Sequence, residues 1–452
     1  MTLARQNNIG LPKERTPNDL ISSPTVMRSR IRFILSGLLF KIALDVSYAT
    51  FLTDAFANHF LTPFPVNFDV LRYLESSLWL LLVLVFLPFS SKLAGGLAFF
   101  CAVVFFYAPI TTIYGMDLDR SRDTVLLSTL AIVAAHLVDI VGFRRRIKTT
   151  LPKHGDTALL ILSFTFVLSF LGISAFTGVL FSMNFDIARV YEFRTEFGSQ
   201  VDVGIFAYTN LWTQKVFTPI ILAVGLRRGS IWLICFALAM HFVYFGVTQH
   251  RSHLFAPILV FIAYLLYRRE FSYAKGYALM AVALFMITQI VITYDLEVIG
   301  ALVIRRALFV GASVTYNWVE YFTEHPNVFF ADNLLKSYIV NQYTGVNLPK
   351  LLGDFMRQDM ELAFNSGLVG SGFAQLGAFG VILYGGIIGA IIRFNRRLID
   401  AGVPPYIPAA ILFFPYRIAW ADADLFTALL SHGLIVGTFA VWLFGSSRNH
   451  AA

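Results

Sequence analysis

The sequence contains few charged residues. Asp, Glu, Lys and Arg make up 14% of the 452 residues, whereas hydrophobic types make up 57%. Soluble domains carry about 25% charged and about 45–50% apolar residues. A chain with so little charge cannot cover a surface that faces water on all sides. The composition therefore excludes a soluble protein and predicts an integral membrane protein.

Cysteine is also scarce, because Cys101 and Cys235 are the only two and each lies inside an apolar run. We therefore expect neither a disulfide nor a cysteine metal site. Residues 1–30 are polar and mixed in charge and lack the short apolar core of a cleaved signal, so we expect a basic cytoplasmic tail. The formal net charge of +8 falls mostly at membrane borders, which argues against a nucleic-acid partner.

Apolar segments of membrane-crossing length recur along the chain. A crossing helix needs about 20 mostly apolar residues, and about twelve segments fit this criterion. No alternation typical of a membrane barrel recurs, so we expect an all-α polytopic fold. The eighth and eleventh segments are short, and we expect them to be tilted, broken or partly re-entrant. The segments are 31–53, 69–89, 93–114, 124–142, 157–181, 206–226, 231–247, 254–267, 275–293, 366–394, 406–418 and 425–445.

Lysine and arginine alternate across the connections between these segments, and basic short loops face the cytoplasm. The basic groups fall on one side if both chain ends are cytoplasmic. This topology predicts cytoplasmic tails at 1–30 and 446–452, membrane helices 1–9 within 31–293, and helices 10–12 within 366–445. It leaves a large periplasmic loop at 294–365, and it places any chemistry on the periplasmic side.

Lysine and arginine are usually enriched on the cytoplasmic side, so each cation expected on the outer side needs an explanation. Arg189 and Arg194 could pair with neighbouring carboxylates. Lys215 is expected on the order of 13 Å inside its span, where a lysine needs a wet cavity or a partner. Arg251 joins two spans with almost no loop. Its neighbours His250 and His253 lack a third ligand at helical spacing, so an anion site is favoured over a metal site.

The long loop contains a predicted amphipathic helix, "EVIGALVIRRALFVGASVTYNWVEYFTEHP". At 100° per residue, Arg306, Ser313, Asn317 and Glu320 share a narrow sector, and Arg305 borders it. The helix either lies flat on the outer leaflet or turns its arginine pair inward onto a substrate; we favour the second arrangement. Guanidinium groups bind phosphate oxygens bidentately, so a lipid diphosphate is the natural ligand.

Two further features allow a structural explanation. Lys41 and Asp45 are four residues apart on one helix and can pair with each other. The glycines of "GLVGSGFAQLGAFGVILYGGIIGAII" divide into two groups. Gly385, Gly389 and Gly386 have the spacing of close helix packing in lipid. The earlier ones, Gly367, Gly370 and Gly372, follow Asn365 and are expected to bend the chain at the outer mouth, where backbone and Asn365 approach a glycan.

A family resemblance rests on several of these motifs. "VIRRALFVGASVTYNWVEYFTEHPNVFFADN", "AFNSGLVGSGFAQLGAFGVILYGGIIGAII" and "DADLFTALLSHGLIVGTFAVW", with "VYEFR", "LWTQKVFTP" and "HRSHLFAP", resemble the bacterial Wzy-type O-antigen polymerases, over roughly residues 185–445. The resemblance implies a C-type membrane glycosyltransferase fold in the inner membrane. It also implies polymerisation, on the periplasmic face, of oligosaccharide repeat units linked to undecaprenyl diphosphate. No metal or other cofactor is expected.

The same resemblance, read with the residue chemistry, gives the candidate site. The implied partners are lipid-linked glycan donor and acceptor and membrane lipids, with a polysaccharide chain-length regulator as a further one. Candidate general bases for the acceptor hydroxyl are Glu320, Asp332, Asp422, Asp424 and His432, and the acceptor could also need none. The candidate catalytic residues are Arg251, Arg305, Arg306, Glu320 and His432, and the candidate substrate-binding residues are Arg194, Lys215, His250, Asp332, Asn365, Gln375 and Arg417.

Three other functions are compatible with the sequence. An O-antigen ligase would share fold and donor but transfer the glycan to a lipid A core sugar. A transporter or flippase for lipid-linked sugars would tend to show internal repeats, and no convincing repeat relates the two halves. A structural or assembly protein would leave the outer arginines without a task.

Overall fold

The computed structural model describes residues 24–59, 62–88, 93–141, 155–185, 204–249, 252–267, 272–332, 335–357 and 362–444. Within these residues the chain is helical, and the one extended pairing is an isolated bridge between Asn67 and Asp117. Each segment expected to cross the membrane contains a helix. The prediction of an all-α fold is therefore confirmed for the described part of the chain.

Several of the long helices are interrupted by π-helical turns, in which the hydrogen bonds run from residue i to i+5. The N-terminal half contains α2 (Pro24–Ser47), η1 (Tyr48–Leu52), α3 (Thr53–Phe56), α4 (Val70–Phe86), α5 (Leu93–Ala102), η2 (Val103–Tyr107), α6 (Ala108–Met116), α7 (Arg122–Val141), α8 (Gly155–Phe176), η3 (Val179–Ser182), α10 (Phe206–Trp212), η4 (Thr213–Phe217) and α11 (Thr218–Arg228). The C-terminal half contains α12 (Ile231–Thr248), α13 (Ser252–Tyr267), α14 (Tyr273–Thr293), α15 (Glu297–Gly300), η5 (Ala301–Phe309), α16 (Val310–Glu324), α17 (Leu348–Arg357), α18 (Leu368–Asp400), α19 (Tyr406–Ala421), α20 (Leu425–Leu429) and α21 (Leu434–Phe444). The turns η1, η2, η4 and η5 are π-helical, and η3 is a 3₁₀ turn.

In the described residues, 9 helices are long and apolar enough to cross a membrane. Eight of them coincide with expected spans, and the ninth, Glu297–Glu324, falls in the segment we assigned to the periplasmic loop. The expected spans 69–89, 206–226, 254–267 and 406–418 are helical but shorter or more polar. The protein is thus an all-α membrane protein, and the topology with twelve crossings stays a prediction.

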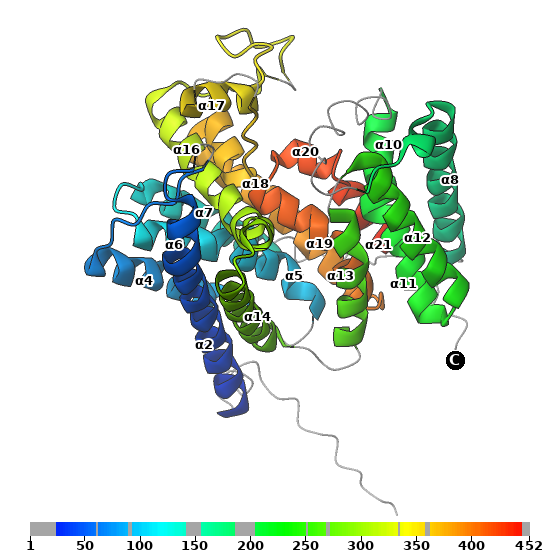
Figure 1. Cartoon of the computed structure of the whole chain (residues 1–452), viewed down its shortest axis with the longest axis horizontal. Helices are drawn as coiled ribbons and strands as arrows, with labels where there is room; N and C mark the ends of the chain where they lie inside the picture. Colours follow the sequence, from blue (N-terminus) through cyan, green and yellow to red (C-terminus); the bar gives the residue numbers. More distant parts are fainter. Residues whose placement is uncertain are drawn as a thin grey trace, which may run out of the picture.

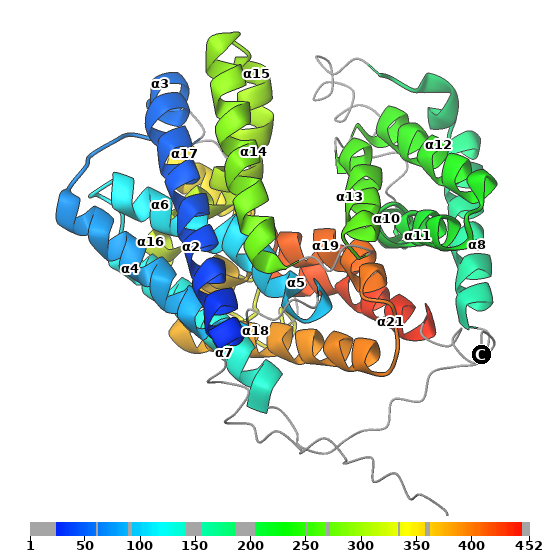
Figure 2. The ribbon, with the colours of Figure 1, turned by 90° about the horizontal axis from the view of Figure 1, so that it is seen from below.

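The helices form two groups joined by a central set (Figures 1 and 2). In one group α2 packs along α14 and contacts α4 and α6. The other group consists of α8, α10, α11, α12 and α13, which appear on the right in Figure 2. Between them α19 packs against α5, and α18 packs along α7. The elements α10, α16, α17 and α20 lie toward the upper side in Figure 1, opposite the N-terminal end of α2.

A second, smaller hydrophobic core lies outside the main one. It is built from α16, α17 and the chain between them, and its members include Trp318, Phe322, Tyr343 and Leu352. Phe364, from the segment that leads into α18, and Ala374, within the first turns of α18, complete it. The predicted periplasmic loop is therefore largely a packed unit that rests on the start of α18.

The helix α18 is broken near its beginning. Leu376 and Gly377 have non-helical backbone angles, and Gly377 has a φ of 61°. A Cβ atom placed on Gly380 would lie 2.0 Å from the carbonyl oxygen of Gly372. In a straight helix, residues eight apart are separated by about 12 Å. The chain therefore folds back sharply, and the expected single span 366–394 consists of a half-helix at 368–375 and a longer segment at 378–400.

Several glycines of this region serve close packing, whereas Gly386, which was also predicted to pack, has no atom nearer than 3.8 Å to its Cβ position. Cβ atoms on Gly385 and Gly389 would lie 2.4 and 2.3 Å from the carbonyl oxygens of Ala131 and Ala135 on α7, which confirms the predicted packing role. The prediction for Gly367, Gly370 and Gly372 is wrong. Their Cβ positions are filled by the protein itself: by Trp420 for Gly367, by Ser366 and Trp318 for Gly370, and by Gly380 for Gly372. The bend lies further on, at Leu376 and Gly377.

Candidate functional site

The structure describes nine of the twelve predicted site residues. Arg194, His250 and Arg251 lie outside the described residues. The others come from elements that are far apart in the sequence: η4, η5, α16, the loop before α17, the start of α18, α19 and the loop after α20. They are Lys215, Arg305, Arg306, Glu320, Asp332, Asn365, Gln375, Arg417 and His432.

Arg305 on η5 points toward the chain that follows α3. One Nη atom contacts Nδ1 of His59 at 3.0 Å and donates to the hydroxyl of Thr62. The guanidinium carbon lies 4.9 Å from the centre of the Phe56 ring, within the range of a cation–π contact. Arg305 is partly buried, whereas its neighbour Arg306 is exposed. The predicted arginine pair therefore divides, with one member turned inward and one outward.

Other arginines gather near Arg305. Burial lowers the pKa of His59, and the positive charges of Arg305 and Arg357 lower it further, against the opposing effect of Glu297. Burial and the charge of Arg120 likewise lower the pKa of Arg357. Three arginines from separate segments are thus close enough for their charges to shift the pKa of one another or of a shared neighbour. We call Arg120, Arg305 and Arg357, together with His59 and Thr62, the arginine cluster.

Arg120 is anchored within this cluster. Its Nε lies 2.9 Å from a carboxylate oxygen of Asp117, and its Nη1 lies 3.4 Å from Oδ1 of Asn317 on α16. The guanidinium also stands 5.7 Å from the Tyr316 ring. Neither Arg120 nor Arg357 was among the predicted site residues. The sequence carried a signal for both, because each is an arginine on the expected outer side, like Arg251.

Lys215 and His432 form a second contact between distant segments. The Nζ atom of Lys215 lies 2.7 Å from Nδ1 of His432. Beside them, Nε1 of Trp212 donates to the carbonyl of Leu430 at 2.6 Å. These two contacts fasten η4 and the end of α10 to the loop between α20 and α21. The lysine inside a predicted span therefore has a polar contact, as its depth required.

Both predicted cationic segments lie in π-helical turns. Lys215 belongs to η4, and Arg305 and Arg306 belong to η5. Such turns are rare, are inserted within α-helices and often occur at functional sites. They also explain an error, because the 100° spacing used for the amphipathic helix does not hold across Ala301–Phe309. Arg306 is exposed while Ser313 is 1% exposed, so the predicted polar stripe is not a single face.

Arg417 is held by protein groups. One Nη atom pairs with the carboxylate of Asp422, and Nη2 donates to the carbonyl oxygen of Ala307 at 3.2 Å. The guanidinium lies 5.6 Å from the Phe105 ring. Arg417 therefore connects α19 to η5, two residues from Arg305. These contacts place Arg417 against the π-helical turn that contains Arg305, and its substrate-binding role stays a prediction.

Gln375 organises the chain at the end of the half-helix of α18. Its backbone carbonyl accepts from the amide of Phe329 at 3.1 Å, and its Oε1 accepts from the amide of Phe330 at 2.6 Å. Its Nε2 donates to Asp332 at 3.1 Å. Phe329 and Phe330 have φ values of 55° and 62°, a conformation that costs a non-glycine residue about 1–2 kcal/mol. Gln375 thus compensates a strained turn and fixes Asp332.

Asp424 lies near this turn, at the start of α20. Its Oδ2 accepts from the amide of Phe426 at 2.9 Å, and its Oδ1 accepts from the hydroxyl of Tyr384 at 3.2 Å. Burial raises the pKa of Asp424, and the negative charge of Asp332 raises it further, although the hydrogen bonds oppose both effects. We call Asp332, Asp424, Tyr384 and Gln375 the carboxylate cluster.

Two predicted residues show no such organisation. Asn365, just before α18, and Glu320, on α16, are both exposed. The structure brings neither into the contacts described above. Their assigned roles stay predictions.

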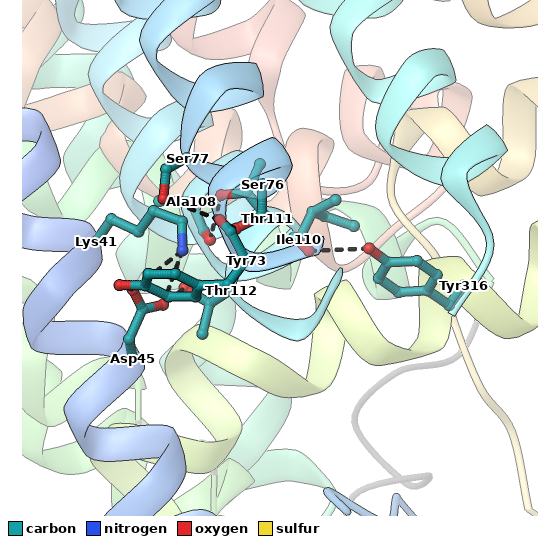
Figure 3. Close-up of polar contacts among 10 residues, drawn as sticks. All are labelled: Lys41, Asp45, Tyr73, Ser76, Ser77, Ala108, Ile110, Thr111, Thr112 and Tyr316. Carbon is teal, nitrogen blue, oxygen red and sulfur yellow. Dashed lines mark hydrogen bonds and ion pairs between the residues drawn. The ribbon is translucent and has the colours of Figure 1, made fainter. Parts of the chain in front are cut away.

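A separate charged pair lies in the interior. Lys41 contacts both carboxylate oxygens of Asp45 at 3.0 Å, as the sequence predicted (Figure 3). Asp45 also accepts from Tyr73 at 2.9 Å and from Thr112 at 2.8 Å. Lys41 is 2% and Asp45 5% exposed. The carboxylate is saturated by four contacts from three helices, so the pair ties α2 to α4 and α6.

No group of three or more His, Cys, Asp or Glu side chains with the geometry of a metal site occurs among the described residues. A comparison of the chain with protein-family models, curated proteins and solved structures finds no match. The resemblance to the polymerases therefore rests on the quoted motifs.

Proposed function

We propose that this protein is a glycosyltransferase of the bacterial inner membrane that polymerises oligosaccharide repeat units linked to undecaprenyl diphosphate. The nascent chain is the donor, and a hydroxyl of a new lipid-linked unit is the acceptor. Both termini are cytoplasmic and the site faces the periplasm. The sequence motifs support this proposal, and the arginine cluster supplies its chemical basis.

The observation that carries the proposal is the partly buried Arg305, which is held by His59 and Thr62, with Arg120 and Arg357 near enough for their charges to act on the same group of residues. Like charges repel, and bringing several guanidinium groups together in a partly buried place costs free energy. Asp117 pairs with Arg120 at 2.9 Å and offsets part of this cost, and an anion bound among the arginines would offset more of it. Guanidinium groups match phosphate oxygens in geometry and stay charged at all physiological pH values. The cluster thus suits a diphosphate whose lipid tail remains in the membrane.

The cluster would act on the leaving group. As the bond from the anomeric carbon to the diphosphate oxygen breaks, negative charge accumulates on the lipid diphosphate. Fixed cations in a poorly hydrated site stabilise that charge more strongly in the transition state than in the ground state. Arg305 is held by His59 and Thr62, so its orientation is set before the substrate binds. Arg251 and Arg306 are proposed as further diphosphate contacts.

The test is replacement of Arg251, Arg305 and Arg306 by lysine, one at a time. Lysine keeps the charge but loses bidentate contact, so each variant should form polymer at least about ten times more slowly at normal expression. Arg228→Lys is the matched control, because Arg228 pairs with Asp156 at the cytoplasmic end of α11 in the proposed topology and should have no effect. Full activity in all three lysine variants would contradict the proposal.

Two rivals predict different products. A ligase deletion leaves polymer attached to undecaprenol, whereas a polymerase deletion leaves a single capped repeat. A pure transporter cannot lengthen lipid-linked repeats in detergent, where no second compartment exists. The product distribution of the deletion strain and an elongation assay with purified protein therefore separate the three functions.

A further inference from the structure

His241 lies inside α12, which is long and apolar enough to cross a membrane. Its side chain is 1% exposed, and neither ring nitrogen has a hydrogen-bond partner among the residues that the structure describes. Histidine is rare inside membrane helices, where it usually faces the bundle interior or a water-filled cavity. A buried polar group without a hydrogen bond costs free energy. The two ring nitrogens of His241 therefore indicate a bound polar molecule.

Four helices meet at Tyr244, one turn along α12 from His241. The Tyr244 ring lies 6.0 Å from the His241 ring, 5.8 Å from the His253 ring on α13 and 4.9 Å from the Phe170 ring on α8. Its hydroxyl bonds to the Thr218 hydroxyl on α11 at 2.8 Å. We call Phe170, Thr218, Tyr244 and His253 the buried layer. His241 lies one turn deeper than this layer in the proposed topology.

Two further buried polar groups lie on the other side of the buried layer. Gln214 on η4 is 2% exposed and Ser174 on α8 is 0% exposed. Within the described part of the chain, Oε1 of Gln214 and Oγ of Ser174 have no hydrogen-bond partner. Gln214 comes about one turn before Thr218, and Ser174 about one turn after Phe170, so both lie on the outer side of the layer. These groups and His241 thus extend inward from the outer end of the α8–α13 group.

The charges around His241 decide which ligand fits. α12 packs against α11, α13 and η3, and none of these elements contains an aspartate or glutamate within its described bounds. On α8, Asp156 pairs with Arg228 at the cytoplasmic end. No carboxylate balances a positive charge on His241, so the imidazole in this apolar interior is neutral. A neutral imidazole has one donor and one acceptor, so its ligand must be uncharged and able both to donate and to accept.

We propose that the helix group α8–α13 encloses an internal water site centred on His241. Water molecules bond to both ring nitrogens and continue past Tyr244 and Thr218 toward Gln214 and Ser174. An internal water makes about three hydrogen bonds to buried groups that otherwise have none, which matches the polar atoms found here. The site is independent of the proposed glycosyl transfer.

The first test uses the full-length protein labelled with ¹⁵N-histidine in lipid bilayers. Solid-state NMR should show His241 as a neutral ring, with one protonated and one unprotonated nitrogen and a cross-peak from the ring N–H to water. His241→Gln assigns the signal, because it removes the ring but keeps a donor and an acceptor. A His241 ring without a water cross-peak overturns the proposal.

The second test compares melting temperatures in detergent. Phenylalanine has a similar shape to histidine but no ring nitrogens. If those nitrogens had no ligand, His241→Phe would raise the melting temperature. With water bound, the substitution leaves Gln214 and Ser174 without bridging partners, and the melting temperature should fall by at least about 2 °C.

His241→Gln should lower the melting temperature less than His241→Phe, because the amide can still bond to water. The control is Leu238→Phe, which adds a ring to the same helix at a side chain that is 37% exposed, and it should melt as wild type does. A His241→Phe protein that melts at or above the wild-type temperature contradicts the water site. A variant that fails to fold is the extreme of the expected loss, and the NMR result then decides alone.

Discussion

Lys215 and His432 are separated by 217 positions in the sequence, yet Nζ of the lysine and Nδ1 of the histidine lie 2.7 Å apart. The contact joins a π-helical turn in one helix group to the loop between α20 and α21. It places both residues beside the segment that begins with Asp424. Two residues selected independently from the sequence therefore belong to one neighbourhood.

This contact predicts a graded response to substitution at His432. His432→Leu removes the acceptor and should destabilise the protein by about 1–3 kcal/mol, because a partly buried amine loses a polar partner. His432→Asn can place an amide oxygen near the position of Nδ1 and should cost less. Thermal unfolding of the purified variants in detergent would measure both. Equal losses for leucine and asparagine would show that the contact does not contribute.

The arginine cluster predicts that diphosphate binding depends on pH through His59. Its pKa is lowered, so His59 is neutral at pH 7 in the free protein. A bound anion raises that pKa, and binding then takes up a proton. Affinity should therefore be flat at high pH and rise as pH falls below about 6.5 toward the lowered value.

The measurement is the affinity for a soluble prenyl diphosphate between about pH 8 and pH 5.5, a window around the ordinary histidine pKa. The ligand itself titrates there, so His59→Gln serves as the reference. The wild-type curve should rise more steeply than the reference curve as pH falls. Parallel curves would show that His59 does not take part in anion binding.

The buried ion pair predicts strong non-additivity. Lys41→Met should cost about 3–5 kcal/mol, because it leaves an uncompensated carboxylate in a low-dielectric interior. The double variant Lys41→Met with Asp45→Leu should cost less than the sum of the single changes. Tyr73 and Thr112 would then lack an acceptor, so some loss should remain. Unfolding free energies for the complete mutant cycle would test this, and simple additivity would count against a coupled pair.

The glycines on α18 offer a matched comparison. Gly389→Ala would place a Cβ atom 2.3 Å from the carbonyl oxygen of Ala135, so α18 and α7 must separate. We expect a loss of at least about 2 kcal/mol, comparable to other overpacked sites. At Gly386 the nearest atom is 3.8 Å away, so Gly386→Ala should be neutral or slightly stabilising. Similar melting temperatures for the two variants would contradict the packing described here.

Much of the fold followed from local properties of the chain. Apolar runs of sufficient length predicted a helix in each expected span, because backbone groups in lipid must be satisfied within the segment. The spacing of Lys41 and Asp45, and that of Gly385 and Gly389, predicted their contacts, since residues four apart share a helix face. Such inferences succeed when the relevant geometry lies within one regular helix.

The errors arose where that regularity ends. The polar stripe assigned to Arg306 and Ser313 assumed an unbroken α-helix, whereas η5 is π-helical. The span at 366–394 concealed a break at Leu376 and Gly377, and the glycines before it pack against Trp420, Ser366, Trp318 and Gly380. Sequence patterns do not reveal how many residues fill each turn or which distant backbone fills a gap.

The sequence by itself determined that this is an all-α membrane protein with cations on its expected outer side. The reason is that a charged side chain inside lipid costs free energy unless it has a partner or faces a water-filled cavity. The tertiary structure decided which of those groups meet. It brought Arg305 to His59, Lys215 to His432, and Gln375 to Asp332, because these contacts depend on how helices pack and where they break. No periodicity along the chain encodes such long-range neighbours.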